Sequence, residues 1–307
     1  MKNTLPQTIT TKELMAIDYR YNYSNEELLK DWYALQKTTV FKTGAQFKPG
    51  MKLCQHFFPN FWDIQNNKGK SFADCWNDPI IMDKVRKWGL KGMSQLWLSW
   101  VRRAVFMAAG LPNSSFYRPH FSRQIILRTN KSHGTLFDPC AGWGGRLLGT
   151  VSAGWRYIGC ESNVETFENL TRMVEFLGID SYVELHNIPA EDFKQSKVDV
   201  VLTSPPYFNL ETYSDSLNQS YNKHKNYDGW KNLWLQPLIE DSLSNINRGG
   251  ISAWNVMKVG KFDLVEDVIS IHANRGWKLV DSLGFQSPLN NIRKLKNKDV
   301  TYLFELD

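Results

Sequence analysis

Four consecutive residues, Ser204-Pro205-Pro206-Tyr207, combine groups suited to holding a planar base that bears an amino group. The two prolines lack N–H donors and stiffen the loop, which leaves its carbonyl oxygens free to accept hydrogen bonds. The serine contributes a hydroxyl, and the tyrosine contributes an aromatic ring on which a base can stack. These residues follow the apolar segment 198–203, which predicts that they end a buried strand. A loop that merely ends a strand is the less favoured alternative.

A second stretch, residues 135–149, predicts a buried strand, a glycine turn and a helix in succession. The apolar start is typical of a parallel strand, and Arg146 begins the helical part. Glycine permits a sharp turn and lets a ligand approach without meeting a Cβ atom. An α/β sheet binds nucleotide-like ligands in this way, although the spacing is not G-x-G-x-x-G and so disfavours a dinucleotide. A tight turn without a ligand is the alternative. The glycines are Gly142, Gly144 and Gly145.

Acidic residues follow three successive predicted strands. Asp138 ends the first strand, Glu161 the second, and Glu191-Asp192 follow the third. Because the carboxyl ends of parallel strands meet at one edge of a sheet, these acids are expected to line one crevice. Glu161 stands where a doubly wound fold places a carboxylate for ribose hydroxyls, and the last pair stands where a side chain can reach a purine amine. Taken singly, each acid is more typical of an ordinary surface.

The second part of the chain alternates strands and helices. Such alternation predicts a mostly parallel sheet that is covered on both faces. The last two predicted strands are joined by a short loop, so they should pair as a hairpin with one strand antiparallel to the rest. Strands are expected near 135–138, 156–160, 182–186, 198–203, 250–256, 278–285 and 299–306, and helices near 144–152, 163–177, 230–246 and 262–274.

The first part of the chain predicts a mainly helical region. Residues 24–38 read as an amphipathic helix with a capping box formed by Ser24 and Glu27. Segments 80–88 and 93–109 also look helical. Tryptophans interleaved with Lys and Arg can stack on bases, although tryptophan is more often a core residue. The six tryptophans before Gly134 are Trp32, Trp62, Trp76, Trp88, Trp97 and Trp100.

Charge is unevenly distributed along the chain. The net charge is +6, yet residues 1–134 hold 20 Lys+Arg and 9 Asp+Glu, a net of +11. A basic first part predicts an acidic partner, and nucleic acid is the commonest one. A solvated basic face without a partner remains the alternative.

Several classes of protein are disfavoured by the composition. No run approaches the 18 apolar residues that indicate a membrane span, and no apolar signal segment opens the chain, so no membrane partner is expected. The four cysteines form no C-x-x-C pair, which argues against a zinc site and against a disulfide framework. We therefore expect no metal site, and a cytoplasmic location.

The motifs D-P-C-A-G-W-G-G, residues 138–145, and T-S-P-P-Y, residues 203–207, together resemble those of the S-adenosylmethionine-dependent DNA amino-methyltransferases. The resemblance covers residues 114–307. It implies an α/β fold of the Rossmann-like methyltransferase type: a doubly wound, mostly parallel seven-stranded sheet with an antiparallel final strand. The expected organisation is a recognition region for substrate or DNA at 1–110, followed by a catalytic domain at 111–307. The family pattern is usually small or hydroxylated at Trp143, and Arg146 is a second departure.

The resemblance implies S-adenosyl-L-methionine as the cofactor and DNA as the partner. Asp138, Ala141 and Gly142 would touch the methionine moiety. Glu161 would hold the ribose hydroxyls and Asp192 the adenine amine. The expected donor-binding residues are Phe116, Phe121, Asp138, Ala141, Gly142, Gly144, Glu161, Ser162, Glu191, Asp192 and Ser204.

The expected reaction methylates an exocyclic amine, cytosine N4 being favoured over adenine N6. Ser204 and the Pro205 carbonyl would accept the two amine hydrogens, so that the nitrogen lone pair faces the methyl group. Tyr207 would stack on a base that has left the duplex. Ser204, Pro205, Pro206 and Tyr207 are thus the expected catalytic residues. An RNA or protein amino-methyltransferase is the nearest alternative, and a non-catalytic nucleic-acid-binding protein that keeps the fold is the second.

Overall fold

The computed structural model describes residues 4–6, 8–39, 48–66, 68–89, 91, 95–111, 115–214, 216–284 and 300–306. The chain forms two compact units. Unit 1 comprises Met1–Asn22, Pro59–Ser115 and Leu210–Ser214, and unit 2 comprises Tyr23–Phe58, Phe116–Asn209 and Asp215–Asp307. This division differs from the predicted boundary after residue 110. Residues 23–58 belong to unit 2 because their helices α2 (Asn25–Gln36) and α3 (Met51–Phe57) pack against α8 (Gly145–Ser152) and α9 (Val164–Leu177) of that unit.

Unit 2 is built on one seven-stranded sheet with the order β5-β4-β3-β6-β7-β9-β8. Every strand pair is parallel except those of β9, which lies antiparallel between β7 and β8. The sheet confirms the predicted doubly wound, mostly parallel fold and the closing hairpin, whose connection falls outside the described residues. The strands are β3 (Thr135–Asp138), β4 (Arg156–Cys160), β5 (Val183–His186), β6 (Val198–Thr203), β7 (Ile246–Val256), β8 (Trp277–Leu283) and β9 (Val300–Leu306).

Strand β7 begins at Ile246, earlier than the predicted start at residue 250. The pair Gly249-Gly250 resembles a turn in the sequence, and Gly249 does adopt a left-handed φ of 75°. The strand nevertheless continues through it, because a register shift opposite Val198 and Val200 of β6 accommodates the irregular backbone.

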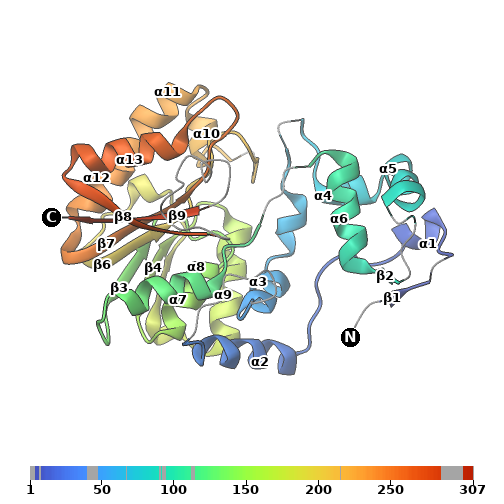
Figure 1. The fold of residues 1–307 in the computed structure, drawn as a ribbon, viewed down its shortest axis with the longest axis horizontal. Coiled ribbons are helices and arrows are strands. Elements are labelled where there is room, and N and C mark those ends of the chain that lie inside the picture. The colour runs from blue at the N-terminus through green and yellow to red at the C-terminus, as the bar shows by residue number, and fades with distance from the viewer. Residues whose placement is uncertain are drawn as a thin grey trace. The chain divides into compact units, whose positions relative to one another are not determined.

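Helices cover both faces of the sheet (Figure 1). One face carries α7 (Pro119–Arg128), α8 (Gly145–Ser152) and α9 (Val164–Leu177), and the other carries α11 (Tyr227–Trp230), α12 (Gln236–Ser244) and α13 (Leu264–Asn274). The helix expected over 230–246 is split, because a π-helical turn, η5 (Lys231–Leu235), separates α11 from α12. The short elements are α10 (Ser220–Lys223), η3 (Asp180–Tyr182) and η4 (Ala190–Asp192).

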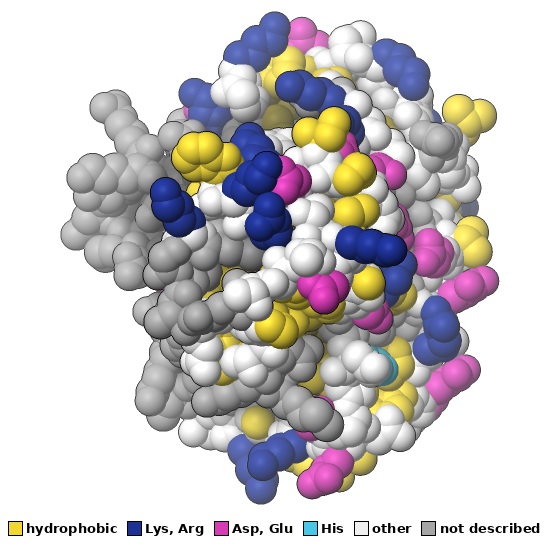
Figure 2. All heavy atoms as spheres, turned by 90° about the vertical axis from the view of Figure 1, so that its right-hand side faces the viewer, with side chains coloured by type: hydrophobic (Ala, Val, Ile, Leu, Met, Phe, Trp, Pro, Cys, Tyr) yellow, Lys and Arg dark blue, Asp and Glu magenta, His cyan; other side chains and the backbone are white. Residues whose placement is uncertain are grey.

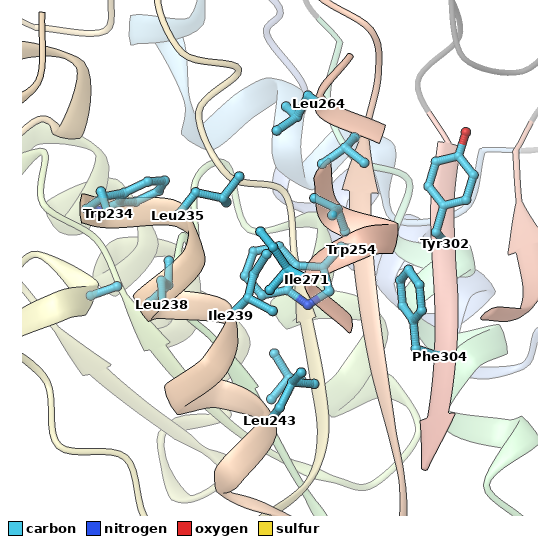
Figure 3. Packing of buried hydrophobic residues seen from close by; sticks show 14 of the residues in the cluster. Trp234, Leu235, Leu238, Ile239, Leu243, Trp254, Leu264, Ile271, Tyr302 and Phe304 are labelled. Carbon is cyan, nitrogen blue, oxygen red and sulfur yellow. The ribbon is translucent and has the colours of Figure 1, made fainter. Parts of the chain in front are cut away.

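The core of unit 2 lies between the sheet and α12 and α13. Trp254 of β7 is fully buried there, and its indole Nε1 donates a hydrogen bond to Ser252 Oγ at 2.9 Å. Figure 3 shows the packing of α12, α13, β7 and β9 side chains in this cluster. A rigid core behind β6 and β7 fixes the position of whatever follows their carboxyl ends. Labelled in that figure are Trp234, Leu235, Leu238, Ile239, Leu243, Trp254, Leu264, Ile271, Tyr302 and Phe304.

Unit 1 is mainly helical in its described part. Its elements are α1 (Thr11–Met15), η1 (Pro59–Asp63), α4 (Phe72–Trp76), α5 (Pro79–Lys84), η2 (Val85–Gly89) and α6 (Leu98–Ala109), with a two-stranded sheet of β1 (Thr4–Leu5) and β2 (Leu96–Trp97). Trp62 and Trp76 form its core with Tyr19 and Phe72. These two tryptophans are therefore structural.

None of the helices in the described part of the chain combines the length and the apolar character that crossing a membrane requires. Within the same residues, no group of three or more His, Cys, Asp or Glu side chains is placed to hold a metal ion.

Candidate functional site

The glycine turn between β3 and α8 presents one open position to a ligand. Gly142 has a left-handed φ of 56°, and an added Cβ there would meet nothing closer than 3.7 Å. The next glycines serve packing instead. A Cβ at Gly145 would overlap the backbone carbonyl of Tyr117, and one at Gly144 would overlap the Met173 side chain. A side chain at Gly144 would therefore point at α9, so this position requires glycine for packing.

Glu161 lies beside this open position, just after β4. Its Oε2 accepts a hydrogen bond from the Gly142 N–H at 2.9 Å, and its Oε1 accepts one from the Asn163 N–H at 2.8 Å. Each carboxylate oxygen keeps a second lone pair that can accept from a ligand hydroxyl. Burial raises the pKa of Glu161 to about 7, although the two backbone N–H groups act in the opposite direction.

The raised pKa of Glu161 predicts a pH-dependent stability. The folded protein keeps the Glu161 proton up to about pH 7, because the pKa there is about 7, whereas the ordinary pKa of a glutamate is 4.5. Unfolding therefore releases this proton between pH 4.5 and about pH 7. Stability contributed by this group should therefore fall as pH rises through that window, by roughly 3 kcal/mol at 1.36 kcal/mol per pKa unit. Urea unfolding at several pH values should show this slope in the wild type and lose it in Glu161→Gln. Equal slopes in both proteins would contradict the assignment.

Asp138 and Arg146 form a buried ion pair inside the turn. The Arg146 Nε–Asp138 Oδ2 distance is 2.6 Å, and the side chains of Arg146 and Asp138 are 5% and 0% exposed. Burial is the largest single influence and lowers the pKa of Arg146, but the charge of Asp138, the hydrogen bond to it and the nearby Tyr157 and Tyr117 together hold that pKa above its ordinary value. The same carboxylate accepts hydrogen bonds from Tyr157 Oη at 2.8 Å and from the Cys140 N–H at 3.2 Å.

This arrangement involves two residues that the sequence singled out. Asp138 was expected to touch the donor, but its carboxylate is enclosed and bonded by three groups of the chain itself. Arg146, a departure from the family pattern, donates to the carbonyl oxygens of Cys140 and Ala141 and so braces the turn from inside. The pair shapes the backbone of the glycine turn.

The aromatic segment ahead of β3 packs on the same turn. The Phe116 ring meets the edge of Trp143 with centroids 5.3 Å apart. Phe121 is buried, and the Arg146 guanidinium lies 5.2 Å from the Tyr117 ring centroid. Ala141 is buried as well, and its N–H donates to the Cys160 carbonyl at 2.9 Å. The structure therefore brings Phe116 to the glycine turn that contains Ala141, whereas Phe121 is buried in α7.

The acids after β5 have unequal surroundings. Glu191 Oε1 accepts from Lys223 Nζ at 2.6 Å and its Oε2 accepts from Trp234 Nε1 at 2.9 Å. These two hydrogen bonds tether Glu191 to α10 and η5. Asp192 is exposed at the end of η4. Ser162 Oγ accepts from Gln219 Nε2 at 3.1 Å.

The hydroxyl groups of Ser204 and Tyr207 converge just after β6. They lie 3.2 Å apart, and both are bonded to Asn255, near the end of the neighbouring β7. Asn255 Nδ2 donates to Ser204 Oγ at 3.3 Å and to Tyr207 Oη at 3.1 Å, and the Asn255 carbonyl accepts from Tyr207 Oη at 3.1 Å. The amide of Asn255 thereby fixes the separation of the two hydroxyls.

A second layer of hydrogen bonds holds Asn255. The buried Thr301 of β9 donates from Oγ1 to Asn255 Oδ1 at 3.0 Å, and Tyr117 Oη lies 3.1 Å from the same Thr301 hydroxyl. Asn255 and Thr301 are direct partners in the β7–β9 register. Both were missed in the sequence. Asn255 interrupts the apolar strand residues 251–256, which is the one signal that could have revealed it.

Phe208, directly after the proline loop, was also missed. It adopts a left-handed φ of 53°, which is rare and costly for a bulky residue. Its buried ring packs against Tyr227, Trp230 and Phe262 at centroid distances of 5.6, 5.8 and 5.9 Å. This packing stabilises the strained turn and so anchors the end of the loop.

Comparison with known proteins gives a likeness in fold only. The sequence matches no known family profile and no curated protein. A methyltransferase from Pyrococcus furiosus is 18% identical over 63% of this chain and 85% of its own, with a TM-score of 0.40. TrmN from Thermus thermophilus is 14% identical over 62% and 49%, with a TM-score of 0.42. An S-adenosylmethionine-dependent methyltransferase from Clostridium acetobutylicum is 10% identical over 61% and 90%, with a TM-score of 0.44. The chain spans about half the length of the Thermus protein.

Proposed function

We propose that unit 2 transfers a methyl group from S-adenosyl-L-methionine to the exocyclic amine of a DNA base, cytosine N4 in preference to adenine N6. The proposal rests on the loop Ser204-Pro205-Pro206-Tyr207, whose two hydroxyls are fixed by Asn255 at the carboxyl edge of a doubly wound sheet. Ligands of such sheets bind at this edge. The glycine turn follows β3, which is the direct neighbour of β6 in the sheet.

The residues around Gly142 fit the proposed donor. An open backbone position and a half-buried carboxylate with spare lone pairs suit a nucleoside whose ribose hydroxyls donate to Glu161. Asp192, exposed at the end of η4 after β5, would hold the adenine amine. When bound, S-adenosyl-L-methionine supplies an electrophilic methyl group on sulfur.

The residues after β6 prepare the acceptor amine. An amine conjugated to a heteroaromatic ring is a poor nucleophile. Ser204 Oγ and the Pro205 carbonyl accept its two hydrogens, which favours a tetrahedral nitrogen whose lone pair is directed outward. Tyr207 offers its ring to the base. This is catalysis by positioning and electrostatic stabilisation.

The decisive measurement is mass spectrometry of nucleosides after the protein has been incubated with donor and DNA. We expect a methyl group on an exocyclic amine, in cytosine more than in adenine, and labelling about 100-fold slower with Ser204→Ala at equal protein concentration. Parallel incubations with tRNA and with protein substrates test the nearest alternative, and label found only there would overturn the assignment to DNA. Calorimetry with the donor tests the non-catalytic alternative, which requires no donor binding.

A further inference from the structure

Two helical stripes of unit 1 expose large apolar side chains interleaved with cations. Along α5 and η2, every fourth residue faces solvent: Ile80, Lys84 and Trp88, the last 74% exposed. Along α6, the exposed positions Trp100, Arg103 and Met107 follow the same helical spacing, with Trp100 45% exposed and Met107 75% exposed. Tryptophans are seldom left this accessible. Together these six residues are called the tryptophan face below.

The two stripes are neighbours on one surface. Lys84 Nζ donates to the carbonyl oxygen of Ala108, which adjoins Met107, at 3.4 Å, and η2 packs against α6. Figure 2 views the side of the molecule that carries these helices and shows Lys and Arg side chains gathered beside exposed hydrophobic ones. The stripes therefore offer rings and cations to the same partner.

The tryptophan face is also strongly basic. Residues 79–111 contain six Lys+Arg and one acid, Asp83. That acid is already engaged, because Asp83 lies 3.1 Å from Arg86 and 2.6 Å from Lys87. Among the described residues, no ion pair joins Lys84 or Arg103 to a carboxylate. Their charges remain available to an anionic partner.

We propose that the tryptophan face binds single-stranded DNA. Lys84 and Arg103 would contact phosphates, while bases stack on Trp88 and Trp100, the combination by which single strands are gripped without sequence preference. Arg103 already lies 5.9 Å from the Trp100 ring centroid, so a cation–π contact supports the ring in an exposed setting. The inference rests on the proposed function for its substrate class, nucleic acid.

The order of residues favours nucleic acid over a membrane surface. A helix that lies on a membrane has a continuous apolar face with cations on the polar side. Here Lys84 stands between Ile80 and Trp88, and Arg103 stands between Trp100 and Met107, so each ring has a cation one helical turn away. Alternation of rings and cations matches a strand in which bases and phosphates alternate.

Fluorescence anisotropy of a labelled mixed-sequence DNA single strand tests the proposal on the full chain without donor. Trp88→Ala and Trp100→Ala should each weaken binding about 5- to 150-fold, the range measured for losing one base–aromatic stack. Lys84→Gln and Arg103→Gln should each reduce the slope of log affinity against log salt by about 0.7. Two matched controls come from unit 2. Tyr182→Ala removes an exposed ring before β5, and Arg156→Gln removes an exposed cation at the start of β4. Both variants should leave the affinity and the salt slope unchanged.

Each other outcome overturns the proposal. These include absence of binding by the wild type, equal binding by all variants, and tighter binding of RNA of the same sequence. Binding to vesicles containing phosphatidylserine that the tryptophan variants lose, without any effect on oligonucleotides, would assign the face to a membrane. The binding assay requires neither donor nor methyl transfer. If no methylated nucleoside is found but the tryptophan-dependent binding is intact, the proposed function is refuted and the binding role of the tryptophan face is not.

Discussion

Replacing Arg146 by Met should lower the free energy of unfolding of unit 2 by about 3–5 kcal/mol. The substitution removes one partner of a buried ion pair and leaves the charge of Asp138 buried without a counter-charge. Asp138 is completely buried, and of its three hydrogen-bond donors only Arg146 carries a charge. Methionine fills a similar volume, so the loss reports on the charge more than on a cavity. Urea unfolding followed by circular dichroism measures the change.

The exposed pair of Arg156 and Glu184 supplies the matched control. Its charges lie 3.6 Å apart with side chains 61% and 43% exposed, so Arg156→Met should cost less than about 1 kcal/mol. The double substitution Asp138→Asn with Arg146→Met should recover part of the stability, since no buried charge is then left unpaired. A loss for Arg146→Met no larger than that of the control would show that the pair does not stabilise the turn.

The order of strands and helices in unit 2 could be predicted because its determinants are local. Apolar runs of four to six residues, glycine turns and helical spacing are visible within a short window, and the hairpin followed from a short connection. Local signals misled where tertiary packing decides. Gly249-Gly250 resembles a turn yet lies within β7. The contacts that join residues 23–58 to unit 2 are made by α2 and α3 with helices far along the chain.

The sequence predicts which residue types lie at the candidate site, but it predicts the role of each residue only in part. The acids were located correctly at strand ends, but the sequence does not say where a carboxylate points. Asp138 turns inward because Arg146, eight positions later, reaches back across the turn to it. Glu191 is held by Lys223 and Trp234, which are distant in sequence. Such partners are set by the fold, so the surroundings of each acid emerge only from the contacts.

Ser204→Ala should reduce kcat about 100-fold, the effect of deleting one hydrogen bond that matters most in the transition state. The Ser204 hydroxyl is expected to accept an amine hydrogen as the nitrogen changes geometry, so its loss should fall on kcat rather than on KM. Donor affinity measured by calorimetry is the internal control and should stay within about twofold, because Glu161 and Gly142 are untouched. A change confined to donor affinity would place Ser204 in the donor site instead.

Asn255 should act through Ser204 and Tyr207, and a double-mutant cycle can show it. Asn255→Leu removes the amide that donates to both hydroxyls, so the hydroxyls lose their fixed separation and kcat should fall at least tenfold. Thr301 keeps its contact with Tyr117, so the hydroxyl behind Asn255 is not left without a partner. If Asn255 works by positioning, adding Asn255→Leu to Ser204→Ala should lower kcat little beyond Ser204→Ala alone, which corresponds to a coupling of about 1–3 kcal/mol. If the reductions in kcat caused by Asn255→Leu and by Ser204→Ala multiply in the double variant, Asn255 supports the fold of β7 and not the geometry of the reacting amine.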